Sequence, residues 1–398
     1  MKFLHLISSV DPSGGGPIEG ALRLHEALVT LGHTGEFATV DAPDASFVGA
    51  FPAKVHALGP SKGTFGYSAH LLPWLRAHAA QFDAVIVNGL WQYPGFATWR
   101  ALAGATTPYF VFTHGMLDPW FKKRYPLKHL KKWLYWPWGE YRVLRDAAAV
   151  LFTCEEERLL ARQSFWLYRS REVVVSYGTS RPPQDEQRLA EVFLSAYPAL
   201  RDKRLLLFLG RIHEKKGCDL LVEAFARRCA TTPDLHLVMA GPDQQGWMPT
   251  LQQTAQRLGI GDRVHWPGML SGDLKWGAFY ASAAFCLPSH QENFGIAVVE
   301  ALGCGRPVLI SNKVNIWREI DADKAGFVEE DTLEGTVGML DRWLGTPPQD
   351  LAALRVAARA SFDDRFRIEQ VAERFVRLVQ HGSESAGAPR AEGTSAHV

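Results

Sequence analysis

Two glutamates stand eight positions apart in the segment PSHQENFGIAVVEALGCGRPV, residues 288–308. In a continuous helix, Glu292 and Glu300 would lie about 12 Å apart along the axis, too far for a close carboxylate pair. Glu292 precedes the expected helix IAVVEAL, and Glu300 lies inside it, so the two acids can reach different parts of one ligand. Carboxylates accept hydrogen bonds from hydroxyls, and the spacing suits the hexose and ribose of a nucleotide-sugar. The alternative is a surface acid followed by an unrelated helix acid.

Anion-binding features accompany these acids. Arg211 and Lys216 lie in the glycine-flanked loop GRIHEKKG, directly after the apolar run at 204–209. Two cations in a strand-to-helix loop would clamp a diphosphate, and the glycines would let the backbone approach it. Gly295 stands at the start of a helix that follows a predicted strand, and the positive end of such a helix favours an anion. The alternative for residues 210–217 is a solvated basic loop.

Short apolar runs alternate with helical patterns along the chain and must position these residues. Such alternation predicts parallel sheets covered on both faces, and therefore an α/β fold with two Rossmann-like, doubly wound domains. Ligands of such folds bind beyond the carboxyl ends of the strands, here in a cleft between the domains. The predicted strands are 3–8, 35–40, 83–88, 108–113, 148–153, 204–209, 235–240, 263–268, 283–288, 306–311 and 325–328.

A stretch rich in charged residues and proline divides the predicted strands and helices into two series. It separates an acceptor-side domain from a donor-side domain, and a late amphipathic helix is expected to pack back on the first domain. The predicted boundaries are residues 1–180 for the N-terminal domain, 181–203 for an interdomain linker, 204–365 for the donor domain, 366–382 for the C-terminal helix and 383–398 for a disordered tail.

Composition narrows the classes of partner and compartment. The 43 basic and 42 acidic residues nearly cancel, which argues against a nucleic-acid partner. The five cysteines are scattered without a C-x-x-C pair or a zinc spacing, as expected in a reduced cytoplasm. The first residues lack the pattern of a signal peptide, and no run reaches the length of a membrane span. We therefore expect a cytoplasmic protein.

Four segments together resemble the donor domain of the retaining glycosyltransferases of family 4, which have the GT-B fold. They are GRIHEKKG, MAGPD at 239–243, WPGML at 266–270 and the long segment beginning at Pro288. The resemblance implies two Rossmann-like domains facing across a cleft. It also implies a retaining hexosyltransferase that moves a hexose from a UDP- or GDP-sugar to a saccharide acceptor, with no cofactor and no metal ion.

The resemblance also assigns roles to individual residues. Arg211 and Lys216 hold the donor diphosphate, Glu292 contacts the sugar hydroxyls, and Glu300 binds the ribose. His114, after the strand at 108–113, matches the family's histidine beside the reacting sugar, although a histidine there can be purely structural. The implied catalytic residues are His114, Glu292, Arg211 and Lys216, and the implied donor contacts are Gly15, Gly16, Arg211, Lys216, Gly268, Met269, Glu292, Asn293, Phe294, Gly295 and Glu300.

The N-terminal half resembles the family more loosely. The glycine run at 14–16 matches the family's first loop, while Asn88 and Trp91 follow a strand end and are expected to meet the acceptor. Two departures affect donor identity and domain geometry: the family's Gly-Gly turn is replaced by NKVNIWRE, and its asparagine-glycine hinge by SYGTS at 176–180. The segment DAD at 321–323 resembles a metal motif of another glycosyltransferase fold, but it lies in a charged turn.

Other functions remain open. An oxidoreductase on this architecture would need G-x-G-x-x-G after a strand, and SGGGPIEG does not give that spacing. A nucleotide-sugar epimerase of the same fold and a non-catalytic nucleotide-sugar-binding protein are further alternatives.

The segment at 120–145 suggests a membrane-linked acceptor. It contains eight Lys or Arg, one acid and eight aromatic residues, with Lys122, Lys123, Lys131 and Lys132 among the cations. Aromatic rings settle at the membrane boundary, and anionic lipid attracts basic residues. We expect peripheral contact with the inner face of the cell membrane and a polyprenyl-diphosphate-linked acceptor, as in surface polysaccharide biosynthesis. The alternative is a solvated basic helix face over a packed aromatic core.

Overall fold

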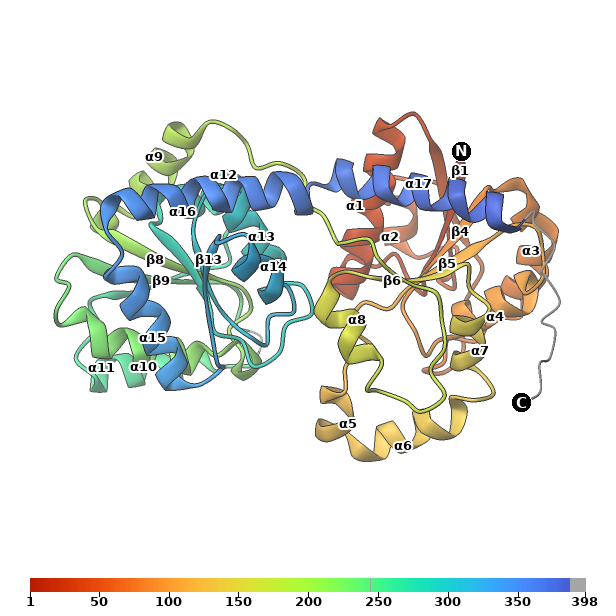
Figure 1. Ribbon diagram of the computed structural model, residues 1–398, viewed down its shortest axis with the longest axis horizontal. Helices are drawn as coiled ribbons and strands as arrows, with labels where there is room; N and C mark the ends of the chain where they lie inside the picture. Colours follow the sequence, from red (N-terminus) through yellow and green to blue (C-terminus); the bar gives the residue numbers. More distant parts are fainter. Residues whose placement is uncertain (244, 387–398) are drawn as a thin grey trace, which may run out of the picture. The chain divides into compact units, whose positions relative to one another are not determined.

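The computed structural model describes residues 1–243 and 245–386, which divide into two compact units. Unit 1 combines an N-terminal stretch with a C-terminal helix, and unit 2 is almost continuous in sequence (Figure 1). Within the described residues, unit 1 comprises 1–153, 158–178 and 368–386, and unit 2 comprises 154–157 and 179–367 apart from residue 244.

Unit 1 contains a parallel sheet of seven strands in the order β3-β2-β1-β4-β5-β6-β7. In this order the chain reverses direction across the sheet beside β1, as in a doubly wound Rossmann sheet. The strands are β1 Lys2–Leu6, β2 Thr34–Thr39, β3 Val55–Ala57, β4 Ala84–Asn88, β5 Tyr109–Phe112, β6 Ala149–Phe152 and β7 Glu172–Val174.

Alternating strand residues supply two separate cores. Leu4, Val85 and Val111 pack with α3 (Leu71–His78), α4 (Tyr93–Leu102) and α7 (Glu140–Arg145) on one face. Phe3 and Ile86 pack with α1 (Gly16–Thr30) and α17 (Ile368–Ala386) on the other. Both faces are therefore covered, which explains the nearly continuous apolar runs. The helices are α1 Gly16–Thr30, α2 Ser46–Gly49, α3 Leu71–His78, α4 Tyr93–Leu102, α5 Trp120–Arg124, α6 Pro126–Tyr135, α7 Glu140–Arg145, α8 Glu155–Ala161 and α17 Ile368–Ala386. The first turn of α8 groups with unit 2. Short 3-10 turns lie at Pro12–Gly14 and Ala79–Gln81.

Unit 2 repeats the topology with six parallel strands in the order β10-β9-β8-β11-β12-β13. The doubly wound α/β prediction is thus confirmed in both units. The strands are β8 Arg204–Leu209, β9 Leu235–Ala240, β10 Val264–Gly268, β11 Ala284–Leu287, β12 Val308–Ser311 and β13 Gly326–Glu329. The helices are α9 Glu186–Ala196, α10 Cys218–Cys229, α11 Met248–Arg257, α12 Gly272–Ala281, α13 Ile296–Gly303, α14 Trp317–Ala322, α15 Leu333–Leu344 and α16 Pro348–Ser361, with η3 Pro198–Leu200, η4 Glu214–Lys216 and a π-helical turn at Phe362–Phe366.

The segment expected to be a linker, 181–203, instead contains α9 and groups with unit 2. α9 packs closely on α12, where a Cβ added to Gly277 would lie 2.2 Å from the carbonyl oxygen of Leu189. A side chain there would force the helices apart, so the contact requires glycine. Leu189 and Phe193 of α9 are fully buried, so α9 belongs to the packed interior of unit 2.

The ends of the predicted elements need small corrections. All eleven predicted strands exist within two residues of their expected bounds, while β3 and β7, each of three residues, were not predicted. α17 continues to Ala386, so the start of the expected tail is helical, and 387–398 lie outside the described residues. Within the described chain, no helix combines the length and apolarity needed to cross a bilayer.

Candidate functional site

His114 lies in unit 1 directly after β5, in a left-handed backbone conformation with φ 47°. Its Nε2 is 3.2 Å from Oδ1 of Asn88, whose Nδ2 donates to the carbonyl oxygen of Ile86. Since the amide nitrogen is used there, Oδ1 accepts from His114 and fixes the Nε2–H tautomer. Burial lowers the pKa of His114 to about 4, so the ring is neutral at pH 7.

Tyr177 connects His114 to the glycine loop, a link that the sequence did not indicate. Its ring meets the His114 ring edge-on with centroids 5.9 Å apart, and its hydroxyl donates to the carbonyl oxygen of Gly16. A Cβ added to Gly20 would collide with the Tyr177 ring, so this close approach needs glycine. The structure thus brings Gly16, Asn88 and His114 together around Tyr177. The hollow left beside His114 encloses about 10 Å³.

Trp91 also follows a strand end, with φ 70°, and joins the aromatic core of unit 1. Its ring lies 5.9 Å from Trp136 and 5.2 Å from Phe165, measured between centroids. The ammonium of Lys132 lies 4.5 Å from the Trp91 ring centroid. Trp91 therefore joins the loop after β4 to the basic segment.

The basic and aromatic segment is partly buried and partly exposed. Trp136 is fully buried and Tyr141 nearly so, in line with the alternative of a packed aromatic core. The α6 helix, in contrast, contributes no buried residue. The exposed apolar side chains of this segment are Tyr125, Leu127, Leu130, Trp133, Leu134 and Trp138. This surface is unusual because charged and large apolar side chains are exposed on one short helix.

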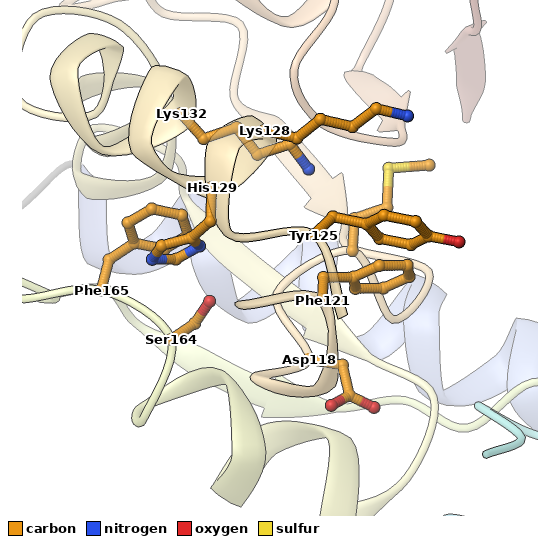
Figure 2. A pocket seen from close by; sticks show the side chains of 9 residues that line it. Asp118, Phe121, Tyr125, Lys128, His129, Lys132, Ser164 and Phe165 are labelled. Carbon is orange, nitrogen blue, oxygen red and sulfur yellow. The ribbon is translucent and has the colours of Figure 1, made fainter. Parts of the chain in front are cut away.

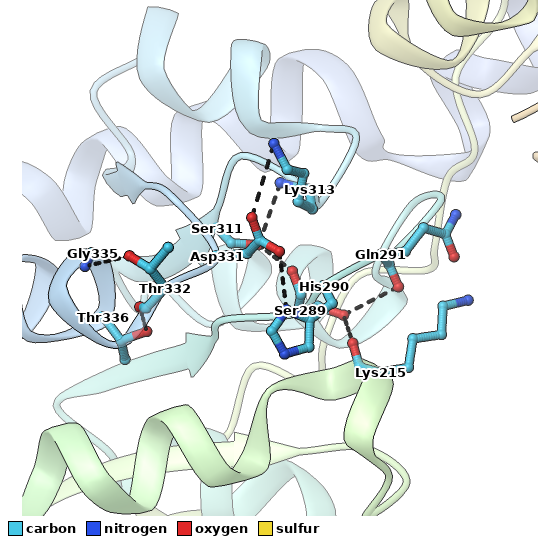
Figure 3. Close-up of polar contacts among 10 residues, drawn as sticks. All are labelled: Lys215, Ser289, His290, Gln291, Ser311, Lys313, Asp331, Thr332, Gly335 and Thr336. Carbon is cyan, nitrogen blue, oxygen red and sulfur yellow. Dashed lines mark hydrogen bonds and ion pairs between the residues drawn. The ribbon is translucent and has the colours of Figure 1, made fainter. Parts of the chain in front are cut away.

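In unit 2, the loop after β8 and the loop after β11 lie in direct contact. Gly217 has φ 65°, and a Cβ there would lie 2.1 Å from the carbonyl oxygen of Pro288. Ser289 Oγ and the His290 amide both donate to the carbonyl oxygen of Lys215, at 2.7 and 2.8 Å. Figure 3 shows these contacts beside the Asp331 carboxylate, which is 3.0 Å from Nδ1 of His290. Arg211, Lys216 and Glu292 thus belong to two loops fixed against each other.

The side chains of Lys216 and Glu292 form an ion pair. The backbone of Glu292 is held by the loop after β12, because its amide donates to Lys313 and its carbonyl oxygen accepts from Asn315, both at 2.9 Å. Burial, followed by the charges of Lys215 and Arg211, lowers the pKa of Lys216. The Glu292 carboxylate acts the other way, because it stabilises the ammonium.

Gly295 has φ 80° and leads into α13. A left-handed residue at this point turns the chain sharply into the helix, which glycine permits at low cost. Phe294 is buried, with its ring centroid 5.8 Å from Phe366, so its side chain anchors the loop. Oδ1 of Asn293 accepts a hydrogen bond from Nδ2 of Asn315 at 3.4 Å. The predicted contacts from Glu292 to Gly295 therefore form one rigid turn at the start of α13.

Glu300 lies inside α13, and only 4% of its side chain is exposed. Its Oε1 lies 2.7 Å from Nζ of Lys275, on α12. Reasoning from the sequence missed Lys275, because a single lysine on a helix carries no motif. Glu300, the acid predicted to bind the ribose, is therefore already paired with a cation.

Gly268 ends β10 with φ 75°, and its carbonyl oxygen accepts from the Gly241 amide at 2.8 Å. The next residue, Met269, is 74% exposed. Both lie at the carboxyl edge of the second sheet, which is also the edge of the Gly217 and Gly295 loops. The two residues predicted to meet the base thus lie at the same edge of the sheet as the other predicted donor contacts of unit 2.

The acids of the segment DAD have structural partners. Asp323 accepts hydrogen bonds from Arg365 Nε at 2.6 Å and from Ser361 Oγ at 2.7 Å, while Asp321 pairs with Lys324 on the surface. In the described parts of the chain, no three His, Cys, Asp or Glu side chains are grouped as a metal site would require. Metal independence stays a prediction.

Two family models match the chain in succession. Residues 15–178 match a "glycosyl transferase 4-like domain", and residues 194–353 match "glycosyl transferases group 1". The two matches together cover most of the chain, and their division follows the division into two sheets. The second match contains the Lys216–Glu292 pair and the α13 turn.

Curated relatives match mainly over shorter stretches. A D-inositol 3-phosphate glycosyltransferase of Segniliparus rotundus is 33% identical over 34% of this chain and 29% of its own length. An alpha-D-kanosaminyltransferase of Streptomyces kanamyceticus is 28% identical over 48% of this chain and 49% of its own. The matched stretches span less than half of each relative. Among solved structures, the HepE protein of Anabaena in complex with UDP has a TM-score of 0.76 at 18% identity, over 96% of this chain and 100% of that one, which shows a shared fold.

Proposed function

The chain belongs to the group 1 glycosyltransferases, and from this premise we propose that it transfers a hexose from a UDP- or GDP-sugar to a lipid-linked saccharide. The observation that carries the proposal is the contact between Lys216 and Glu292 at the start of α13. A cation, a carboxylate and a helix N-terminus adjoin there, which suits a ligand with phosphate and hydroxyl groups. The UDP complex of the Anabaena neighbour supports a nucleotide donor.

In this proposal, unit 2 holds the donor. Arg211 and Lys216 stabilise the charge that develops on the leaving diphosphate, as preorganised cations do. Glu292 accepts hydrogen bonds from the hexose, and Glu300 accepts one from the ribose. No metal ion is required, because Arg211, Lys216 and the dipole of α13 supply the positive potential.

We further propose that transfer retains the anomeric configuration. Glu292 is engaged with Lys216 and is committed to binding hydroxyls, so it is not the covalent nucleophile. Attack would instead occur on the face of the leaving group, with the departing phosphate taking the acceptor proton. His114 is neutral at pH 7. It would therefore stabilise the charge that develops on the reacting sugar through its ring dipole and hydrogen bonds, and not through a positive charge of its own. An inverted linkage in the product, identified by NMR, would contradict retention.

The acceptor side of the proposal relies on α6. Leu127, Leu130 and Leu134 are 78%, 54% and 61% exposed, and the lysines of the same helix face solvent or aromatic rings. Such a surface suits the headgroup region of an anionic bilayer. We therefore propose peripheral contact with the inner face of the cell membrane and a polyprenyl-diphosphate-linked acceptor in surface polysaccharide biosynthesis.

Thermal shift with UDP, GDP and their common sugars tests the donor assignment. A bound nucleotide raises the melting temperature of the protein by mass action. The nucleotide-sugar that raises it is then incubated with the protein, and release of the free nucleotide is measured with and without extracts that contain lipid-linked saccharides. Acceptor-dependent release is expected. Sugar interconversion without acceptor would identify an epimerase instead, and binding without turnover under any condition would identify a non-catalytic binder. EDTA is expected to leave the transfer unaffected, and loss of activity with recovery in magnesium or manganese would contradict metal independence.

A further inference from the structure

An open groove runs beside α6 in unit 1. It encloses about 680 Å³, within the range of small-molecule sites. Leu130 and Trp166, both in its lining, are 54% and 53% exposed, so the groove presents apolar surface to any ligand. We call it the α6 groove, and its lining includes Lys122, His129, Leu130, Trp133, Phe165 and Trp166.

A smaller hollow, with two lysines in its lining, adjoins this groove. It encloses about 60 Å³, and three of its lining residues, His129, Ser164 and Phe165, also line the α6 groove. Lys128 and Lys132 complete it from α6, and Figure 2 shows them on one side with Asp118 on the other. We call it the lysine hollow. One ligand with a polar head and an apolar chain could therefore occupy both sites.

The lysine hollow has a surplus of positive charge. Within the described residues, neither Lys128 nor Lys132 lies within ion-pair distance of a carboxylate; instead their ammonium groups lie 5.1 Å from the Tyr125 ring and 4.5 Å from the Trp91 ring. The rings attract the ammonium groups but carry no neutralising charge. Asp118, the acid in the lining, accepts a hydrogen bond from the Trp120 amide at 2.7 Å.

A nearby buried acid does not remove this surplus. Glu140, at the start of α7, is 1% exposed, and burial raises its pKa to about 8. The carboxyl is thus mostly protonated at pH 7 and offers Lys132 little compensating charge. Burial lowers the pKa of Lys132, and a bound anion would stabilise its ammonium form. An incoming anion would supply the missing negative charge.

We propose that the lysine hollow binds the diphosphate of a prenyl-diphosphate acceptor and that the α6 groove holds the first part of its hydrocarbon chain. The inference rests on the proposed function, since it assigns the lipid portion of that acceptor to named residues. Lys128, Lys132 and His129 would contact phosphate oxygens, while Leu130, Trp133 and Trp166 would pack on the chain. A free phosphate would leave the groove unused, whereas one prenyl diphosphate complements both sites.

Calorimetry with farnesyl diphosphate tests the assignment on the full chain, below the aggregation concentration of the lipid and without vesicles. Inorganic diphosphate and farnesol serve as the two halves of the ligand. Farnesyl diphosphate is expected to bind at least about tenfold more tightly than either half, because charge-assisted contacts and apolar burial both contribute. Equal affinity for inorganic diphosphate would identify a simple anion site and overturn the proposal.

Matched substitutions on α6 locate the site. Lys128→Gln and Leu130→Asn are each expected to weaken farnesyl diphosphate binding by about tenfold. Lys131→Gln and Leu134→Asn remove the same groups from exposed positions that line neither site, and they should bind as the unmodified protein does. Equal effects of the two pairs would overturn the assignment. All four positions are more than a third exposed, so none of these changes opens a cavity in the core.

Nucleotide binding separates this inference from the proposed function. If nucleotide-sugar is bound and transferred while farnesyl diphosphate is not bound, the lipid subsite is wrong and the transferase proposal stands. If farnesyl diphosphate binds with the expected variant pattern but no nucleotide-sugar stabilises the protein, the transferase proposal fails and the lipid site stands.

Discussion

The ammonium of Lys216 is paired with the carboxylate of Glu292, 76 residues further along the chain. The cation expected to hold the donor phosphate is thus held by the acid expected to hold the donor sugar. A diphosphate arriving beside Lys216 would share its charge with Glu292, so the two binding roles are coupled.

Removing either cation of the donor loop is expected to slow transfer strongly. Arg211→Ala and Lys216→Ala should each reduce turnover by roughly a hundredfold, since each removes a contact to charge that develops in the transition state. Circular dichroism should show a retained fold. Lys324→Ala, on the surface of the same unit, serves as the charge-matched control. Near-normal turnover in both loop variants would remove these residues from the mechanism.

Glu300 is expected to distinguish ribose from deoxyribose. If its carboxylate accepts a ribose hydroxyl hydrogen bond, the unmodified protein should bind the preferred nucleoside diphosphate more tightly than its 2′-deoxy form. Glu300→Gln should reduce that preference by about fivefold to tenfold, less than the full loss of a hydrogen bond to a charged group, because the amide oxygen can still accept one. Calorimetric dissociation constants measure the ratio, and Glu334→Gln, an exposed change on α15, is the control. An unchanged ratio in Glu300→Gln would leave this acid a structural partner of Lys275.

Gly217→Ala is expected to damage both stability and donor binding. Two effects add: an alanine at φ 65° costs about 1 kcal/mol, and its Cβ would lie 2.1 Å from the Pro288 carbonyl oxygen. Gly259→Ala isolates the first effect, because Gly259 has φ 70° and nothing within 4 Å of an added Cβ. Thermal unfolding should show the larger loss for Gly217→Ala. Equal losses of stability in the two variants would mean that the loops after β8 and β11 can move apart without further destabilising the protein.

Acid is expected to destabilise unit 1 through His5. This β1 residue is fully buried against the Phe37 ring, and burial, reinforced by the charge of His25, lowers its pKa from 6.5 to about 3. Since the folded pKa lies below the unfolded value, the unfolded chain binds the proton first as the pH falls. Stability is therefore full above pH 6.5 and declines between 6.5 and 3, by at most about 1.4 kcal/mol per pH unit from this group.

Urea unfolding between pH 7.5 and 4.5 measures that decline. His5→Leu should make the decline shallower, and the part due to His114, whose pKa burial lowers to about 4, should remain. His70→Leu, at an exposed position, should leave the decline unchanged. A slope that is the same in His5→Leu and in the unmodified protein would assign the acid sensitivity to other groups.

Membrane contact is expected to depend on the lysines of α5 and α6. The protein should float with vesicles that contain anionic lipid and should dissociate in high salt, because the attraction is about 1 kcal/mol per basic residue and is screened. Lys122→Glu, Lys128→Glu and Lys131→Glu combined should abolish flotation. Lys132 is left unchanged because it packs over Trp91. Lys62→Glu, Lys203→Glu and Lys324→Glu change the net charge equally at exposed positions elsewhere and should still float. Absence of flotation at low salt would favour a soluble acceptor.

The sequence predicted the sheets better than the contacts between side chains. Buried parallel strands are apolar throughout, so eleven of them stood out, but β3 and β7 have three residues each and are partly exposed. α9 was mistaken for a linker because prolines and charges precede it. Glu292 and Glu300 were found through their spacing, whereas Lys275 and Tyr177 act through contacts between distant segments. No local pattern indicates such partners.

The C-terminal helix α17 has a consequence for the order of synthesis. Ile368, Val371, Phe375 and Val379 cover the same face of the first sheet as Phe3 and Ile86, although nearly all of unit 2 separates them in sequence. A ribosome therefore releases the whole of unit 2 before it supplies the helix that closes unit 1. Until then, the apolar face beside β1 stays open and is a natural target for chaperones. β1 is thus among the last strands of unit 1 to be fully covered.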